Sequence, residues 1–241
     1  MQIIPIYIEK EIVPSDDLAD LILDSEKIND GDIIVVAQKI ISKQEGRLIK
    51  LSGVTPSLLA EGISSQYQKD PRITELILSE SKRIIRMGHG ILIVETNNGF
   101  ICANAGIDES NVEQGYATLL PLNSDMSAQK ICNKILAQTQ KHVAVIVSDT
   151  FGRPFRMGQT NYAIGVSGLN PILDYAGTFD SFDKVLRVTA IAVADELASA
   201  AELVMGKSLK CPLVIIRDYH FKNEEHTVDE LIRPENEDLF R

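Results

Sequence analysis

The chain has 241 residues and carries 24 Lys and Arg against 34 Asp and Glu, which gives a formal net charge of −10. Hydrophobic residues make up 44% of it, so one large domain or two small ones can fold around a core without disulfides or a structural metal. The acidic balance argues against a nucleic-acid or anionic-membrane surface, because those partners require clustered positive charge. It does not exclude a small anionic ligand, which needs only a local basic pocket.

The three cysteines are Cys102, Cys132 and Cys211. They are widely separated, and the sequence has neither a CxxC pair nor a Cys/His set with zinc-ligand spacing. No positively charged leader precedes an apolar stretch at the N-terminus, and no apolar run approaches the roughly 20 residues of a membrane span. We therefore expect a soluble, reduced, cytoplasmic protein.

Hydrophobic periodicity and turn signals predict an irregular alternation of strands and helices. Strands are expected over residues 3–8, 33–37, 91–95, 100–103, 143–147 and 213–216. Helices are expected over residues 15–25, 55–69, 71–85, 127–138 and 189–205, with one short helix in the polar tail after residue 222. This alternation favours a mixed α/β or α+β fold. No linker or change in composition marks a domain boundary.

Met205-Gly206-Lys207-Ser208 resembles the end of a phosphate-binding P-loop. However, the first P-loop glycine would fall at Ala201, and the segment follows a predicted helix instead of a strand. We therefore interpret Gly206 as a helix C-cap that is followed by a surface lysine. GxGxxG after a strand, HExxH and GxSxG are absent, and His220 and His226 are interpreted as surface residues.

Three polar segments, residues 38–47, 104–111 and 148–156, each follow a predicted strand. In α/β sheets, ligand sites lie at the carboxyl ends of strands. Within these segments the oxygen donors of Asp108, Asp149 and Thr150 suit Mg²⁺ or Mn²⁺, ions that share their shell with carboxylates, water and substrate phosphates.

Four cations accompany these donors and could neutralise a polyphosphate or carboxylates. They are Lys39, Lys43, Arg153 and Arg156. The alternative is that the two aspartates cap local backbone in turns and that the cations are solvated. Both interpretations stay open, because spacing does not show that the three segments meet in space.

The same segments resemble the coenzyme F420 precursor:γ-L-glutamyl ligase family. The similarity covers, in order, ISKQEGR at 41–47, ANAGIDESNV at 103–112, SDTFGRPFR at 148–156, AIGVSG at 163–168, and ADELA at 194–198 through Met205-Gly206-Lys207. It extends from about residue 3 to residue 217, so it is far more specific than any single short motif.

The resemblance implies a dimeric, family-specific fold of mixed sheets with flanking helices. It further implies one γ-glutamyl ligase domain over residues 1–241, without a fused nitroreductase-like domain; a division into two subdomains stays open. The implied reaction adds L-glutamate to the F420 precursor (F420-0, and F420-1 where a second glutamate is added). GTP would phosphorylate the precursor carboxylate, and the glutamate amine would attack the acyl phosphate, releasing GDP and phosphate.

The resemblance also implies roles for individual residues. Asp108 and Asp149 would bind Mg²⁺ or Mn²⁺, with Thr150 on a second metal ion and K⁺ as a further cation. The residues at GTP-contacting positions would be Glu11, Ile12, Val13, Gln38, Lys39, Lys43, Asn111, Met205, Gly206, Lys207 and Ser208. Arg153 and Arg156 would contact anionic groups of the substrates, and no residue is expected to act as a covalent nucleophile.

Some positions depart from the family pattern. Asp183 stands where glycine is common, Lys184 where arginine is usual, and Asp218 where glycine is frequent. These changes leave the precursor specificity and the number of added glutamates open. The alternatives to a ligase are a metal-dependent nucleotide hydrolase that uses Asp108 and Asp149, and a nucleotide-binding regulatory module.

Overall fold

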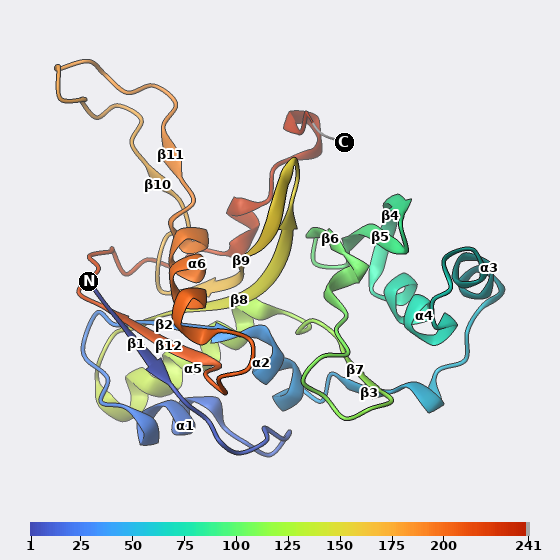
Figure 1. The fold of residues 1–241 in the computed structure, drawn as a ribbon. Coiled ribbons are helices and arrows are strands. Elements are labelled where there is room, and N and C mark those ends of the chain that lie inside the picture. The colour runs from blue at the N-terminus through green and yellow to red at the C-terminus, as the bar shows by residue number, and fades with distance from the viewer. Residues whose placement is uncertain (240–241) are drawn as a thin grey trace.

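The computed structural model describes residues 1–239 and centres on a five-stranded mixed sheet (Figure 1). Its strands are, in spatial order, β1 (Gln2–Ile6), β12 (Leu213–Arg217), β2 (Ile33–Ala37), β8 (Ala144–Arg153) and β9 (Arg156–Ser167). β2 and β8 are parallel, and the other neighbouring pairs are antiparallel. The sheet and its flanking helices confirm the mixed α/β fold expected from the sequence.

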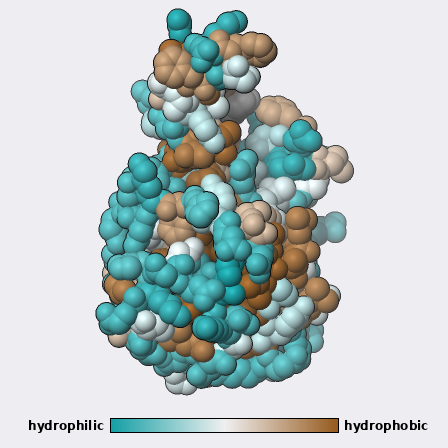
Figure 2. Space-filling view, turned by 90° about the vertical axis from the view of Figure 1, so that its left-hand side faces the viewer, coloured by the Kyte–Doolittle hydropathy of each residue, from teal (hydrophilic) through white to brown (hydrophobic). Residues whose placement is uncertain are grey.

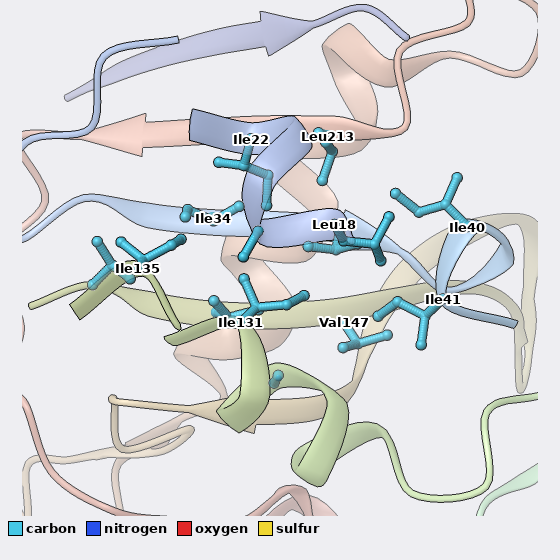
Figure 3. Packing of buried hydrophobic residues seen from close by; sticks show 14 of the residues in the cluster. Leu18, Ile22, Ile34, Ile40, Ile41, Ile131, Ile135, Val147 and Leu213 are labelled. Atoms are coloured by element: carbon cyan, nitrogen blue, oxygen red, sulfur yellow. The ribbon is translucent and has the colours of Figure 1, made fainter. Parts of the chain in front are cut away.

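Helices cover both faces of this sheet, which explains the continuous apolar run in β2. Ile34 and Val36 face α1 (Leu18–Ser25) and α5 (Ser124–Thr139), whereas Ile33 and Val35 pack in the cluster of α6 (Val193–Met205). Figure 3 shows the first cluster, where side chains of α1 and α5 meet β2, β8 and β12. Each fully buried aliphatic side chain there contributes about 1.5–3 kcal/mol to folding.

A separate hydrophobic cluster lies beside the main sheet. It forms between α3 (Leu58–Tyr67), α4 (Pro71–Ser79) and a three-stranded sheet of β4 (Ser81–Gly88), β5 (Ile91–Thr96) and β6 (Ile101–Ala103). A two-stranded ribbon of β3 (Leu48–Lys50) and β7 (Tyr116–Thr118) joins this part to α2 (Gln38–Gln44), the helix that directly follows β2 (Figure 1).

Two hairpins project from the same side of the main sheet (Figure 1). One is the distal half of β8 and β9. The other, which we call the arm, is the segment 173–191 whose base is the pairing of β10 (Leu173–Asp174) with β11 (Ala190–Ile191). No helix within residues 1–239 has the length and hydrophobicity needed to cross a membrane.

Several sequence predictions are confirmed by local contacts. Asp17 caps α1, and Asp70 caps α4, whose first residue is Pro71. Residues 97–100, which include Asn97-Asn98-Gly99, connect β5 to β6. Gly206, with φ of 56°, is the C-cap of α6, as expected.

Other element predictions were wrong. The helix predicted over residues 71–85 ends at Ser79, because residues 81–88 form β4, in which Ile84 pairs with Val94 of β5. The helix predicted from residue 189 begins at Val193, since Ala190–Ile191 pair with the other side of the arm.

The strand β9 and the helix α2 were not expected. Instead of one short helix, the described part of the tail holds two 3₁₀ helices, η3 (Val228–Leu231) and η4 (Glu235–Glu237). Two more 3₁₀ turns, η1 (Leu51–Gly53) and η2 (Asn104–Gly106), lie earlier in the chain.

Candidate functional site

The candidate site lies where the parallel strands β2 and β8 end their pairing. Ala37 of β2 pairs with Ser148 of β8, and this is the last pair of the two strands. Beyond it, β2 is followed by α2, and β8 continues into Asp149 and Thr150. This is the edge at which α/β sheets place ligands. The loop that carries Asp108 reaches the same edge from the separate cluster of α3, α4 and β5, and an isolated β-bridge between Asp108 and Thr118 holds it.

Lys39, in the first turn of α2, binds the loop that carries Asp108. Its Nζ donates to Asp108 Oδ2 at 2.6 Å and to the Ser110 carbonyl oxygen at 2.8 Å. Asp108 Oδ1 also accepts the Ser110 backbone N–H at 2.7 Å. Burial by itself would raise the pKa of Asp108, but the hydrogen bonds from Lys39 and Ser110 outweigh it, so the pKa is lowered.

Asp149 has the opposite electrostatic balance. Burial, with a contribution from the Asp108 charge, raises its pKa to about 6, although the Thr150 backbone N–H and the charges of Lys39 and Lys207 act against the shift. A carboxylate held in this way is penalised for its charge in the free protein, so a cation that binds beside it recovers that free energy.

Thr150 is in contact with Lys207, which lies in the turn after α6. Lys207 Nζ donates to Thr150 Oγ1 at 2.6 Å, and it also pairs with Glu202 at 3.0 Å. Lys207 therefore belongs to the site without being part of a P-loop. Asn161 of β9 lies opposite Thr150, and their side chains are hydrogen-bonded at 2.6 Å.

Lys43 connects the Asp108 loop to the N-terminal segment. Its Nζ donates to Glu11 Oε1 and to the Asn111 carbonyl oxygen, the latter at 3.1 Å. Lys43 is nearly buried, one turn after Lys39 on α2. Asn111, whose carbonyl accepts this bond, adopts a left-handed backbone conformation with φ of 54°.

The structure does not bring every predicted site residue into this cluster. The side chains of Ile12 and Met205 are buried in the two main hydrophobic clusters, and Gln38 Oε1 accepts a hydrogen bond from Ser42 within α2. Any contact of Ile12 or Met205 with a nucleotide would therefore involve the main chain. Val13 and Ser208 are exposed.

The two arginines lie farther along the β8–β9 hairpin. Arg153 Nη2 donates to the Met157 carbonyl oxygen at 2.7 Å, and Arg156 is exposed at the start of β9. Of the histidines, His220 is exposed, as expected, and His226 lies between Glu224 and Glu230.

The donor set fits a hard divalent cation that shares its shell with a substrate. Within residues 1–239, no group of three or more His, Cys, Asp or Glu side chains is arranged to hold a metal ion by itself. The cluster instead offers the Thr150 hydroxyl and two carboxylates, Asp108 and Asp149, whose charges interact. Mg²⁺ and Mn²⁺ are commonly bound in this way, by one or two carboxylates together with water and substrate phosphates.

Sequence reasoning missed Asn161, which is only 4% exposed. It lies in GQTNYA, a segment with no apolar alternation before Tyr162, so no strand was predicted there. A turn at Arg153-Pro154-Phe155-Arg156 was the available signal, because a hairpin closed at that point places Asn161 opposite the SDT segment.

Comparison with known proteins identifies the family of the chain. The family model F420-0:Gamma-glutamyl ligase matches residues 8–218. The chain is 48% identical over 235 residues to the coenzyme F420:L-glutamate ligase of Methanothermobacter thermautotrophicus, which covers 94% of this chain and 93% of the relative. The proteins of the same name from Methanocaldococcus jannaschii (46% identity; 89% of this chain and 86% of the relative) and Methanopyrus kandleri (39%; 100% and 98%) are also similar. The chain is therefore a ligase that belongs to the F420-0:gamma-glutamyl ligase family.

Proposed function

We propose that this protein adds L-glutamate to the F420 precursor F420-0, with GTP as the phosphate donor. The observation that carries the proposal is the cluster of Asp108, Asp149 and Thr150 with Lys39 and Lys207 at one edge of the sheet. The names of the relatives supply the two substrates, coenzyme F420 and L-glutamate.

The proposed chemistry has two steps. A carboxylate oxygen of the precursor attacks the γ-phosphorus of GTP, the bond to the bridging oxygen breaks, and GDP leaves. The glutamate amine then attacks the carbonyl carbon of the acyl phosphate, loses a proton and displaces phosphate. No residue of the protein has to form a covalent bond.

The residues of the cluster would offset the charge that opposes the first step. A carboxylate and a triphosphate repel each other, so positive charge must be held between them. Mg²⁺ or Mn²⁺, two per site, would be held by Asp108, Asp149 and Thr150 and would supply most of that positive charge. K⁺ is proposed as a further cation. Lys39, Lys43 and Lys207 would bind phosphate oxygens directly, and Arg153 and Arg156 would contact anionic groups of the precursor or glutamate.

We also propose that the protein is a homodimer. Large hydrophobic side chains are exposed on both projecting hairpins: Met157 on β8–β9, and Phe179, Phe182 and Val188 on the arm. Figure 2 shows hydrophobic groups on the projecting part at the top of the molecule. A second copy of the chain would bury these side chains, which are otherwise in contact with water.

The decisive experiment incubates the purified protein with F420-0, L-glutamate, GTP and Mn²⁺ or Mg²⁺, and leaves out one component at a time. We expect a product whose mass is higher by one glutamyl unit for each addition, only in the complete mixture. Asp108→Asn is the matched inactive control. Folded protein that forms no such product would contradict the proposal, and GDP release without precursor and glutamate would point to a nucleotide hydrolase.

A further inference from the structure

Asn161 lies directly across the β8–β9 ladder from Thr150 and is buried. Its Oδ1 is 2.6 Å from Thr150 Oγ1, and its Nδ2 points toward the Ser148 hydroxyl at 3.5 Å. The Asn161 carbonyl oxygen accepts a hydrogen bond from Ser199 of α6 at 2.8 Å. Helix α6 therefore fixes the backbone that carries this amide.

The hydrogen-bonding capacity of a threonine hydroxyl fixes the direction of each bond. The hydroxyl has one proton and two lone pairs, whereas the ammonium of Lys207 can only donate. Thr150 Oγ1 therefore accepts from Lys207 and donates its proton to Asn161 Oδ1. The opposite amide orientation would direct two donors at the hydroxyl and would leave its proton without this acceptor.

From this geometry we infer that Asn161 is a positioning residue for metal binding at Thr150, an inference that rests on the proposed function. By accepting the hydroxyl proton on the buried side, Asn161 turns the lone pairs of Thr150 Oγ1 toward the side on which Lys207 lies. A neutral hydroxyl binds a cation through a lone pair, so a proton pointing toward the cation would oppose binding. Groups that orient metal ligands in this way typically change metal affinity about 10- to 100-fold when they are removed.

The test compares Mn²⁺ binding by the full-length wild-type chain and four variants, measured by electron paramagnetic resonance of free Mn²⁺ with and without GTP. Asn161→Leu keeps the size of the side chain and removes the acceptor, and we expect it to weaken one class of Mn²⁺ sites by about 10- to 100-fold. Asn161→Asp keeps an acceptor oxygen, and we expect its affinity to equal or exceed that of the wild type. Thr150→Val should lose the same class of sites, and the double variant should lose no more than Thr150→Val does alone.

Wild-type Mn²⁺ affinity in Asn161→Leu would overturn the inference. So would a loss of Mn²⁺ affinity in the double variant that equals the product of the losses in the two single variants. A merely structural role would lower the thermal midpoint without changing Mn²⁺ affinity, so the midpoint is measured for each variant. If Asn161→Leu does not fold, Asn161→Ser replaces it, because the shorter side chain cannot reach Thr150. Wild-type protein that binds no Mn²⁺ even with GTP would overturn the proposed metal dependence itself. If the wild type binds Mn²⁺ and the Asn161 variants bind it with the same affinity, only the inference about Asn161 is overturned.

Discussion

At the scale of single residues, the site is held together by three lysines, two on α2 and one directly after α6. Lys39 binds the Asp108 loop, Lys43 binds Glu11 and Asn111, and Lys207 binds Thr150. The protein is strongly acidic as a whole, with a net charge of −10. Local cations therefore decide whether a triphosphate is attracted to this edge of the sheet, because charges beyond about 10 Å are screened by salt.

Asp149 is expected to lower the stability of the free protein, and Asp149→Asn should raise it. Its folded-state pKa of about 6 lies above the ordinary value of 3.8 for an aspartate, so the carboxyl group favours folding when it is protonated and opposes folding when it is charged. The penalty is largest above pH 6 and fades as the pH falls from 6 toward 3.8. In EDTA at pH 8 the variant should gain up to about 3 kcal/mol in the free energy of unfolding, and less at pH 5.

Urea unfolding at the two pH values measures this gain. Asp24→Asn, at an exposed position of α1, is the matched control and should change little. The same Asp149→Asn variant should lose Mn²⁺ binding. An Asp149→Asn protein that is less stable than the wild type at pH 8 would contradict the interpretation of Asp149 as a destabilising ligand.

At the scale of elements, the β8–β9 hairpin carries Asp149, Thr150 and Asn161 of the site, and α5 supports it from one side. Gly165 of β9 lies against the first residue of α5: a Cβ atom built there would be 2.4 Å from Ser124 Cβ and 2.5 Å from the Ser124 carbonyl carbon. Only glycine permits this close approach. The AIGVSG motif therefore has a packing role that its sequence does not reveal.

Gly165→Ala should push α5 away from β9 and destabilise the protein by about 1–3 kcal/mol or more, because backbone atoms cannot move aside like a flexible side chain. Gly62→Ala is the matched control. Gly62 lies inside α3 with no atom near its added Cβ, and alanine should stabilise that helix by about 0.8–1 kcal/mol. The denaturant midpoint of unfolding is measured for both variants. The same change of midpoint in Gly165→Ala and Gly62→Ala would contradict the prediction.

The elements that the sequence did not predict are those that depend on distant partners. Residues 81–85 resemble the continuation of α4, but pairing with β5 draws them into a strand. β9 begins with polar residues and becomes a strand because β8 pairs along almost its whole length. Caps such as Asp70-Pro71 were predictable, since the capping contact involves only neighbouring residues.

At the scale of the whole molecule, two projecting hairpins expose hydrophobic side chains that the three clusters do not bury (Figures 1 and 2). Phe182 is 81% exposed and Val188 is 92% exposed. Asp183, one of the departures from the family pattern, lies on the same arm with φ of 59°. Glycine adopts this conformation without strain, so Asp183→Gly should fit the same backbone.

We expect the wild type to sediment at twice the chain mass of 26.6 kDa, and the double variant Phe179→Ser/Phe182→Ser to shift toward the monomer. The reason is the loss of apolar surface that a partner copy would cover. Leu58→Ser/Leu59→Ser on α3 removes two equally exposed leucines elsewhere and should leave the mass unchanged. A wild-type monomer at micromolar concentration, or an arm variant that stays dimeric, would contradict the dimer through the arm.

The sequence by itself determined the fold class, the buried strands β2 and β8, the hydrophobic segments that cover them and the chemical type of the donors. Those properties are local, since they follow from side-chain hydrophobicity, capping and the oxygen and nitrogen groups within short motifs.

The tertiary structure decided which donors meet. Ala37 and Ser148 are distant in the chain, and only their parallel pairing brings Lys39 near Asp149. Asn161 and Lys207 reach Thr150 from β9 and from the end of α6. Such contacts depend on how the sheet is assembled, because the energy that selects them comes from burying residues far apart in the sequence.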